Sequence, residues 1–310
     1  MLSVRPYRMA DEARWDEVVA QSRNGTFLHR RAYMDYHAAR FTDASLLVEE
    51  DGVAVAVLPA NRDGDVVSSH GGLTYGGLIA TRGLRAERTL AALEHIGDHY
   101  RRAGVHRFTY KPVPHVFHAV AAEEDLYAMH RLGATLVRRD LSSVLAPAAA
   151  AGMNTNRRRA IARARAAGVT TRPGTAMGPF HAMLADVLRR HDARPTHTLA
   201  ELELLRSRFP TGIVLHEAVR GDELLAGALV YDFGHAVHAQ YLAASPAGKA
   251  CGALSLLLAE LMGGVYARRP CFSLGISTED EGRVLNSGLV AQKESFGARA
   301  VVHDHYAWVL

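Results

Sequence analysis

The sequence predicts a mixed α/β protein in which one structural unit occurs twice in tandem. Of its 310 residues, 48% are hydrophobic and 22% are charged, which suits a globular chain with two domains of ordinary size. A set of similar segments recurs along the chain, at a constant spacing in the second part of each copy and a looser one in the first, and each copy alternates strand-like and helix-like segments. We place the first unit at residues 1–150 and the second at residues 151–310.

The repeat is clearest in the second part of each copy. An amphipathic segment, Arg85–Arg102, predicts a helix that leads into a short strand, and the apolar segment Ala253–Tyr266 stands in the same relation to a later strand. A second helix, a glycine and a last strand follow in both copies. The equivalent positions, 164 residues apart in each case, are Phe108 and Phe272 in the strands and Gly133 and Gly297 before the last strands.

Each copy is expected to begin with a β-hairpin. Ser45–Pro59 turns at Asp51-Gly52, and Ile213–Tyr231 turns at Gly221-Asp222. A further strand follows each hairpin and ends near a tyrosine. The order in each unit is therefore hairpin, strand, helix, strand, helix and strand. The two tyrosines are Tyr75 and Tyr241.

Composition excludes several classes of protein. No apolar run approaches the length of about 20 residues that a membrane-spanning helix needs, and the N-terminus lacks the apolar core of a secretory signal. The two cysteines, Cys251 and Cys271, give neither a disulfide framework nor a zinc signature. His95 and His99 are four residues apart, but no HExxH motif accompanies them. We expect a cytoplasmic protein without a metal.

The predicted order of elements resembles the Gcn5-related N-acetyltransferase (GNAT) fold. Two copies in one chain resemble the Fem aminoacyltransferases and the broader FemAB-like family. The local segments that carry this resemblance are NRRRAIARARAAGV, QYLAAS, FSLGIS and LNSGLVAQKESFGA. The resemblance implies transfer of an acyl group, often from an aminoacyl-tRNA, onto an amine. It also implies that the second unit holds the donor site, that the first has lost its own, and that no cofactor is needed beyond the donor.

The segment Asn156–Arg172 is rich in arginine and has no acidic residue. It predicts a helix with Asn154 or Thr155 as its cap and Gly168 at its end. An anionic partner, either tRNA phosphates or the diphosphate of an activated substrate, would compensate its charge. The alternative is a solvated arginine-rich face. The arginines assigned to donor binding are Arg157, Arg158, Arg159 and Arg163.

A second donor-binding segment is Ser245–Gly252, between a strand and a helix. Acetyltransferases of this fold carry [Q/R]-x-x-G-x-[G/A] here, and its backbone N–H groups hold the diphosphate of coenzyme A. This chain has serine in place of arginine or glutamine, which argues against acyl-CoA. A simple helix start is the alternative. The residues assigned to the site are Ser245, Gly248, Lys249 and Gly252.

The catalytic assignment begins from the scarcity of lysine, which occurs at three positions only. Lys293 lies in the terminal K-x-x-F-G segment, where the resemblance implies a cation that stabilises the tetrahedral oxyanion or the leaving group. A surface lysine near a helix end is the alternative. Tyr241 and His238 are the other catalytic candidates. The general base is not ranked among His238, Tyr241, Asp232, Glu279 and Glu281.

Motifs of the first unit are assigned to the acceptor. They include the glycine-rich run Ser69–Gly77 and the end of the strand before Pro112. Tight packing of the glycines is the alternative. The residues assigned to acceptor binding are His29, Tyr36, His70, Tyr75, Lys111 and His115.

The sequence thus predicts a Fem-like transferase that binds tRNA and lets an amine attack the aminoacyl ester directly. No covalent enzyme intermediate is expected, because neither cysteine has the setting of a nucleophile. One alternative is an N-acyltransferase that uses acyl-CoA. Another is a tRNA- or nucleotide-binding module without catalysis.

Overall fold

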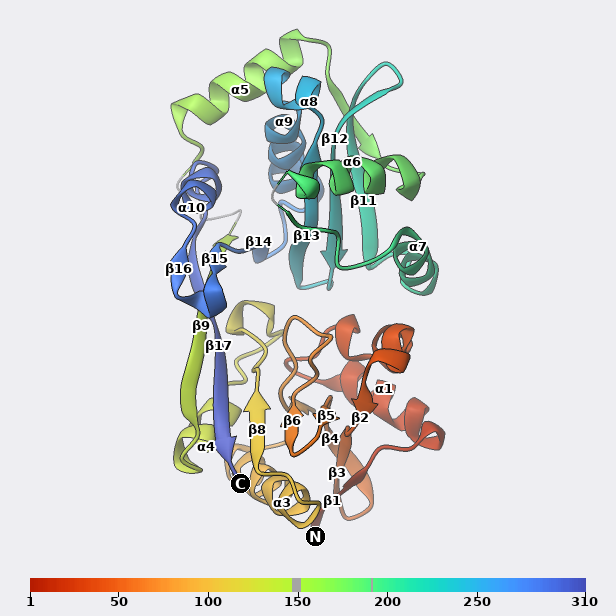
Figure 1. Cartoon of the computed structure of the whole chain (residues 1–310), viewed down its shortest axis with the longest axis vertical. Helices are drawn as coiled ribbons and strands as arrows, with labels where there is room; N and C mark the ends of the chain where they lie inside the picture. Colours follow the sequence, from red (N-terminus) through yellow and green to blue (C-terminus); the bar gives the residue numbers. More distant parts are fainter. Residues whose placement is uncertain (147–151, 191) are drawn as a thin grey trace. The chain divides into compact units, whose positions relative to one another are not determined.

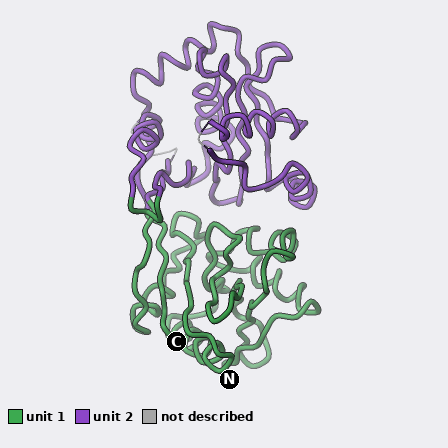
Figure 2. Tube along the Cα trace, in the orientation of Figure 1, with its two compact units in different colours: residues 1–140, 280–283, 302–310 green, residues 141–279, 284–301 purple. Residues whose placement is uncertain are grey.

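The computed structural model describes residues 1–146, 152–190 and 192–310, and the chain divides into two compact units (Figure 2). Unit 1 comprises Met1–Asp140, Asp280–Arg283 and Val302–Leu310, and unit 2 comprises Leu141–Glu279 and Val284–Val301. The boundary expected at residue 150 lies outside the described residues. Among the described residues, unit 1 ends at Asp140 and unit 2 begins at Leu141, and the end of the chain belongs to unit 1 again.

Unit 1 contains one four-stranded sheet in the order β1-β3-β4-β7 and a second set of strands in the order β17-β8-β6-β5-β2 (Figure 1). Its helices and strands, with the 3₁₀ turns marked η, are β1 Leu2–Pro6, η1 Met9–Asp11, α1 Glu12–Gln21, η2 Phe27–His29, α2 Arg31–Met34, η3 Asp35–Arg40, β2 Thr42–Asp43, β3 Leu46–Glu50, β4 Val53–Leu58, β5 Asn61–Asp63, β6 Val66–Ser68, β7 Ile79–Ala80, α3 Ala86–Arg102, β8 Arg107–Tyr110, η4 His115–Phe117, α4 Glu124–Arg131 and the first part of β9 Thr135–Leu145.

Unit 2 contains a mixed sheet in the order β10-β11-β12-β13-β14-β9. Only the β13–β14 neighbours are parallel in this run. Its elements are α5 Thr155–Ala166, β10 Thr170–Pro173, α6 Met177–Arg189, α7 Leu199–Arg208, β11 Ile213–Arg220, β12 Glu223–Asp232, β13 Ala236–Ala244, α8 Pro246–Cys251, α9 Ala253–Glu260, a π-helical turn Leu261–Val265, β14 Cys271–Ile276, β15 Thr278–Glu279, β16 Val284–Leu285, α10 Ser287–Glu294 and the first part of β17 Arg299–Val309; the turn η7 Asp280–Gly282 belongs to unit 1.

The predicted repeat and fold class are confirmed. The last strands of the two copies, β9 and β17, begin at Thr135 and Arg299 and end at Leu145 and Val309, so both pairs of ends are 164 residues apart. The hairpins β3–β4 and β11–β12 also form as predicted. One detail differs, because Tyr75 lies in a loop between β6 and β7 and not at a strand end.

The two last strands are exchanged between the units. β9 belongs to the first copy in sequence, yet its end pairs with β14 of unit 2, where Leu145 lies opposite Phe272. β17 belongs to the second copy, and its end pairs with β8 of unit 1, where Trp308 lies opposite Phe108. Each unit is therefore completed by a strand from the other copy.

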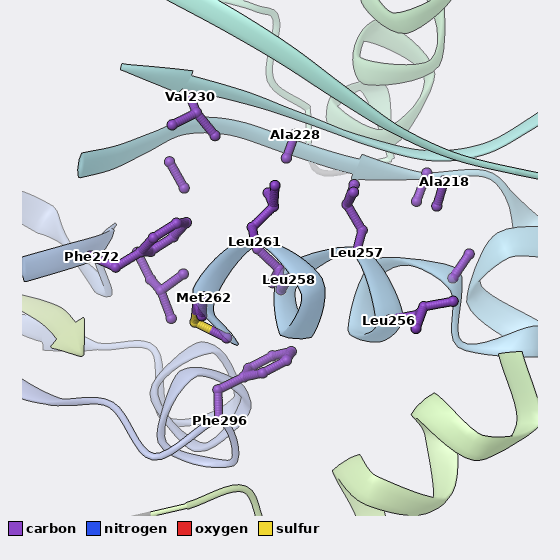
Figure 3. Close-up of a cluster of buried hydrophobic side chains, with 14 of the residues drawn as sticks. Ala218, Ala228, Val230, Leu256, Leu257, Leu258, Leu261, Met262, Phe272 and Phe296 are labelled. Carbon is purple, nitrogen blue, oxygen red and sulfur yellow. The ribbon is translucent and has the colours of Figure 1, made fainter. Parts of the chain in front are cut away.

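The unit 2 sheet is covered on both faces (Figure 1). A Cβ added at Gly227 of β12 would meet the Phe180 ring of α6, whereas Ala226 and Ala228 face the opposite side and belong to the core around α9. Figure 3 shows leucines of α9 and the following π-helical turn against β12, with Phe272 and Phe296 beside Met262. Helices on both faces fix the sheet, so its strand ends can hold a site rigidly.

Candidate active site

The candidate site begins where β13 and β14 separate. The two parallel strands pair from Ala236 with Cys271 to His238 with Ser273 and no further. β13 continues to Ala244 paired with β12 alone. In such a strand, alternate residues direct N–H and C=O away from their partner. The second half of β13 therefore presents backbone polar groups to the space between the strands.

A cavity of about 470 Å³ occupies this part of unit 2. Its walls are mostly apolar, and its polar side chains lie on α5, α8, α9 and α10. The lining residues are Arg157, Val187, Leu242, Ala243, Ala244, Gly248, Lys249, Gly252, Leu254, Ser255, Leu258, Leu274, Leu289, Gln292, Lys293 and Phe296. An apolar pocket with a few converging polar groups is the usual form of a small-ligand site.

Lys293 is buried in the wall of this cavity. Its ammonium donates to the carbonyl oxygens of Gly275 (2.8 Å) and Ile276 (2.7 Å) and to the Ser277 hydroxyl (2.8 Å). Burial lowers the pKa of Lys293 to about 8. All three N–H groups are thus engaged, and the lysine holds the end of β14 while placing a positive charge at the cavity.

His238 lies at the last paired position of the two strands. Its Nδ1 is 3.1 Å from the Ser273 Oγ, and the same oxygen accepts from the Gly275 amide at 3.2 Å. Gly275 has φ +77°, a conformation that favours glycine, and its carbonyl is one of the acceptors of Lys293. Two of the predicted catalytic residues, His238 and Lys293, are therefore joined through Ser273 and Gly275.

Tyr241 lies three residues further along β13 and pairs with His197, which the sequence analysis missed. The Tyr241 hydroxyl is 2.7 Å from the His197 Nδ1, and His197 is buried. Burial raises the pKa of Tyr241, so the phenolate that could act as a base is scarcely formed near neutral pH. The signal for His197 is weak in the sequence, because it stands in a loop with no motif around it.

Gly248, Lys249 and Gly252 of the Ser245–Gly252 segment line the cavity, and the segment is not an open loop. Ser245 caps α8, and its Oγ accepts from the Gly248 amide at 3.0 Å. A Cβ at Gly248 would lie 1.9 Å from the Leu225 carbonyl, and one at Gly252 would lie 2.6 Å from the Ala160 carbonyl. Gly248 therefore allows α8 to pack closely against β12, and Gly252 allows a close approach to α5.

The predicted basic helix is α5, and Asn154 is its cap, accepting from the Arg157 amide at 2.9 Å. Arg157 turns inward. Its guanidinium donates to the Ser255 hydroxyl (2.7 Å) and twice to the Ser295 hydroxyl (3.0 and 2.8 Å), and it lies over the Phe296 ring at 4.1 Å. Burial lowers its pKa. Within the described chain it pairs with no carboxylate.

The other three predicted arginines are exposed. Arg158 donates to the Met153 carbonyl and to the Thr155 hydroxyl (3.0 Å), both neutral groups. Arg159 and Arg163 have no ion pair among the residues that the structure describes. By contrast, Arg165 on the same helix pairs with Glu260 at 2.8 Å. The helix thus carries an exposed cationic face of Arg158, Arg159 and Arg163, named here the basic face.

Two of the predicted acceptor residues meet inside unit 1. The Lys111 ammonium donates to the carbonyls of His70 (2.8 Å) and Leu73 (2.7 Å), and burial lowers its pKa to about 8. The His70 side chain is buried, which lowers its pKa to about 3. Lys111 therefore fixes the glycine-rich loop. A Cβ at Gly76 would lie 2.3 Å from the Ser69 carbonyl, which is the tight packing given as the alternative.

The remaining acceptor candidates are spread over unit 1. His29 is 0% exposed, and burial lowers its pKa to about 4. Its ring lies 5.9 Å from that of Tyr75, which stacks on Phe117. Tyr36 is half-buried beside other aromatic rings, and His115 is exposed. His29 is thus sealed in the unit 1 interior, where no substrate reaches it without rearrangement.

The other general-base candidates are engaged elsewhere. Asp232 accepts from Arg269 at 2.8 Å, and Glu279 accepts from the Asn286 amide at 2.8 Å. Glu281 lies in unit 1. The described ranges contain no cluster of three or more His, Cys, Asp or Glu side chains arranged for a metal, and none of their helices is long and apolar enough to cross a membrane.

Comparison with known proteins agrees with this architecture. Residues 151–281 match the family model of the acetyltransferase (GNAT) domain. The sequence matches no curated protein. The fold is similar to that of FemX (TM-score 0.69, 12% identity, 99% of this chain and 97% of the other). L-PGS from Bacillus licheniformis has a TM-score of 0.60 at 10% identity, covering 95% of this chain and 90% of that one.

A third similar structure is a tandem GNAT protein from the clavulanic acid biosynthesis pathway (TM-score 0.52, 10% identity, 99% of this chain and 98% of the other). The chain therefore has the FemAB-like double-GNAT fold that the sequence predicted. The prediction of an acyltransferase is confirmed at the level of the domain, since residues 151–281 match the acetyltransferase (GNAT) domain model.

Proposed function

Taking the double-GNAT fold as the premise, we propose that the chain transfers an aminoacyl group from aminoacyl-tRNA to an amine. The reacting ester lies in the cavity between β13 and β14, and the amine attacks its carbonyl directly. A C–N bond forms, the C–O bond to the terminal ribose breaks, and the ribose oxygen takes up a proton.

This choice of donor rests on the first turn of α8, where the backbone N–H groups named below are missing or already hydrogen-bonded. The diphosphate of coenzyme A needs free N–H groups at this position. Here Pro246 has no N–H, the Gly248 amide is bound by the Ser245 hydroxyl, and the Lys249 amide is bound by the Ser245 carbonyl. A donor whose phosphates lie elsewhere suits this site better than acyl-CoA.

The basic face of α5 supports the same donor. Three exposed arginines that have no carboxylate partner in the described part of the chain, Arg158, Arg159 and Arg163, lie on the helix whose Arg157 lines the cavity. A folded RNA places many phosphates around its reactive end, so such a face attracts it at low salt.

We assign the chemistry to the junction of β13 and β14. His238 is the proposed proton acceptor for the attacking amine, because it stands where the strands separate. Lys293 acts by its charge and by holding the β14 end, since its three N–H groups are already engaged. Tyr241 and His197 form a neighbouring pair that orients the acceptor.

The test is a donor screen with purified full-length protein. Binding of charged tRNA, acetyl-CoA and longer acyl-CoAs is measured at low and moderate salt, followed by transfer to a panel of amines. We expect salt-sensitive tRNA binding. Neutralising the basic face in Arg158→Ala/Arg159→Ala/Arg163→Ala should reduce the slope of log affinity against log salt by about 2 to 3.

The matched control is Arg165→Ala on the same helix, which removes an arginine already paired with Glu260 and should change the salt slope least. Saturable coenzyme A binding with indifference to tRNA would establish an acyl-CoA-dependent N-acyltransferase instead. Binding of tRNA without transfer to any amine would establish a non-catalytic tRNA-binding module.

A further inference from the structure

A second, smaller cavity adjoins the candidate active site. It has a volume of about 280 Å³ and lies between the first turn of α5 and the last turn of α10. We name it the amide groove. Its lining residues are Asn154, Asn156, Arg157, Ala291, Gln292 and Ser295.

Two side chains line both cavities, namely Arg157 and Gln292. They therefore form the partition between the apolar cavity of about 470 Å³ and the amide groove. A ligand that extends out of the apolar cavity on this side passes the Arg157 guanidinium before it reaches the groove.

The partition carries charge that the protein itself does not neutralise. A guanidinium has five N–H donors. Three of those on Arg157 bind the hydroxyls of Ser255 and Ser295, which leaves two without an acceptor in the described chain. No carboxylate pairs with it there, although it is half-buried. Two donors on one planar fork match two oxygens of a phosphate.

Beyond the Arg157 guanidinium, the amide groove is lined by amide side chains. The side chains of Asn156 and Gln292 make no hydrogen bond within the described residues. An amide offers a donor and an acceptor together, which is the pattern that pairs with the edge of a nucleobase. Single-stranded RNA is recognised through such base edges, because its bases are not paired.

We propose that the amide groove binds the nucleotide preceding the terminal adenosine of the donor, and that Arg157 binds the phosphate between the two. This inference rests on the proposed function, in which the aminoacylated end of tRNA enters the apolar cavity. Because every tRNA ends in single-stranded CCA, the nucleotide in the groove is a cytidine. The site then reads an unpaired RNA end, in addition to the charge of the RNA body.

The test uses probes that need no knowledge of the amino acid. Binding of adenosine, AMP, the dinucleotide CpA and coenzyme A to the full-length protein is measured by calorimetry. The difference in affinity between adenosine and AMP measures the contribution of the phosphate. The difference in affinity between AMP and CpA measures the contribution of the groove. We expect CpA to bind about tenfold more tightly than AMP, the size of one good base contact.

The variant is Asn156→Ala/Gln292→Ala, which removes both amides without adding charge. Alanine favours helices and both positions are exposed, so folding should be retained. Arg157 stays unchanged, because it also joins α5 to α9 and to the end of α10. CpA should then bind no better than AMP, with AMP affinity within about twofold of wild type. Gln21→Ala, an exposed amide of unit 1, is the control and should keep the preference.

The subsite is wrong if wild-type protein binds CpA no better than AMP, or if the double variant keeps the preference. Either result leaves the proposed function standing when charged tRNA still supports transfer. Coenzyme A binding without any binding of AMP or CpA would overturn the proposed function, and the subsite with it.

Discussion

Equivalent positions of the two units carry apolar side chains at the cavity of unit 2 and polar ones in unit 1. Leu274 and Leu289 line the unit 2 cavity, and the residues 164 positions earlier are Tyr110 and Asp125. In unit 1 the Tyr110 hydroxyl donates to the Asp125 carboxyl at 2.6 Å and accepts from the Leu78 amide at 2.8 Å. Tyr110 is 0% exposed and Asp125 is 6% exposed.

The same order of helices and strands therefore holds different side-chain contacts in the two units. Tyr110 and Asp125 tie β8, α4 and the end of the glycine-rich loop together across the space that corresponds to the unit 2 cavity. Leu274 and Leu289 have no polar atoms on their side chains, so the equivalent space in unit 2 stays available to a ligand. The side chains at these positions thus differ between the units, while the order of elements is the same.

The largest effect should come from placing a tyrosine in the unit 2 cavity, at the position equivalent to Tyr110 of unit 1. Leu274→Tyr places a ring in the cavity, and we expect kcat/KM for transfer to fall about 1,000-fold, equivalent to about 4 kcal/mol. Steady-state kinetics and donor titration measure this. Leu274→Met, which conserves volume, should keep most of the activity. Wild-type kinetics in the tyrosine variant would place the donor outside this cavity.

The reverse change should destabilise unit 1. Tyr110→Leu removes a buried ring and leaves both the Asp125 carboxyl and the Leu78 amide without their partner. We expect the free energy of unfolding to fall by about 3–4 kcal/mol in chemical denaturation, with donor affinity unchanged. The double variant Tyr110→Leu/Asp125→Leu copies the unit 2 pair and should be less destabilised, since no buried carboxyl remains. A double variant that is worse than the single one would contradict this account.

The buried Asp125 should also make the free energy of unfolding depend on pH. The equivalent residue of unit 2, Leu289, does not titrate. Burial raises the pKa of Asp125 to about 6, against about 4 in an unfolded chain. Between these values the folded state holds more protons, so the free energy of unfolding falls as pH rises from 4 to 6, by about 3 kcal/mol. Asp125→Asn should lack this decline. Denaturation of both proteins across pH 4–7 tests it, and parallel curves would exclude an ionising Asp125 as the cause.

A further comparison is Lys293, whose equivalent in unit 1, 164 positions earlier, is the buried Met129. Lys293→Met keeps the length of the side chain and removes the charge, so we expect kcat to fall about 10- to 100-fold, or about 1.4–2.7 kcal/mol. Because burial lowers the Lys293 pKa to about 8, wild-type activity should decline above pH 8, where the ammonium loses its proton. The methionine variant should show no such decline. An unchanged pH profile would assign the decline to another group.

Much of this organisation is readable in the sequence. The spacing of 164 residues, the hairpins at Asp51-Gly52 and Gly221-Asp222, and the capped basic helix all follow from local patterns, because strand alternation, turns and helix caps depend on near neighbours. Five residues assigned from the sequence to donor binding or catalysis line the unit 2 cavity, namely Gly248, Lys249, Gly252, Arg157 and Lys293. The acceptor residues were less predictable. His29 and His70 look like ligands in a sequence, and only packing shows that they are buried.

By itself the sequence determined the repeat, the order of elements and several of the segments that line the unit 2 cavity. Tertiary structure decided what those segments do. It exchanged β9 and β17 between the units, turned Arg157 away from its neighbouring arginines onto Phe296, and engaged every N–H of Lys293. The physical reason is that these outcomes depend on contacts between residues that are not near neighbours in the sequence, from 16 to 18 positions apart for Lys293 to far more for Arg157 and the two strands, or on which face of a helix is covered. No local pattern encodes them.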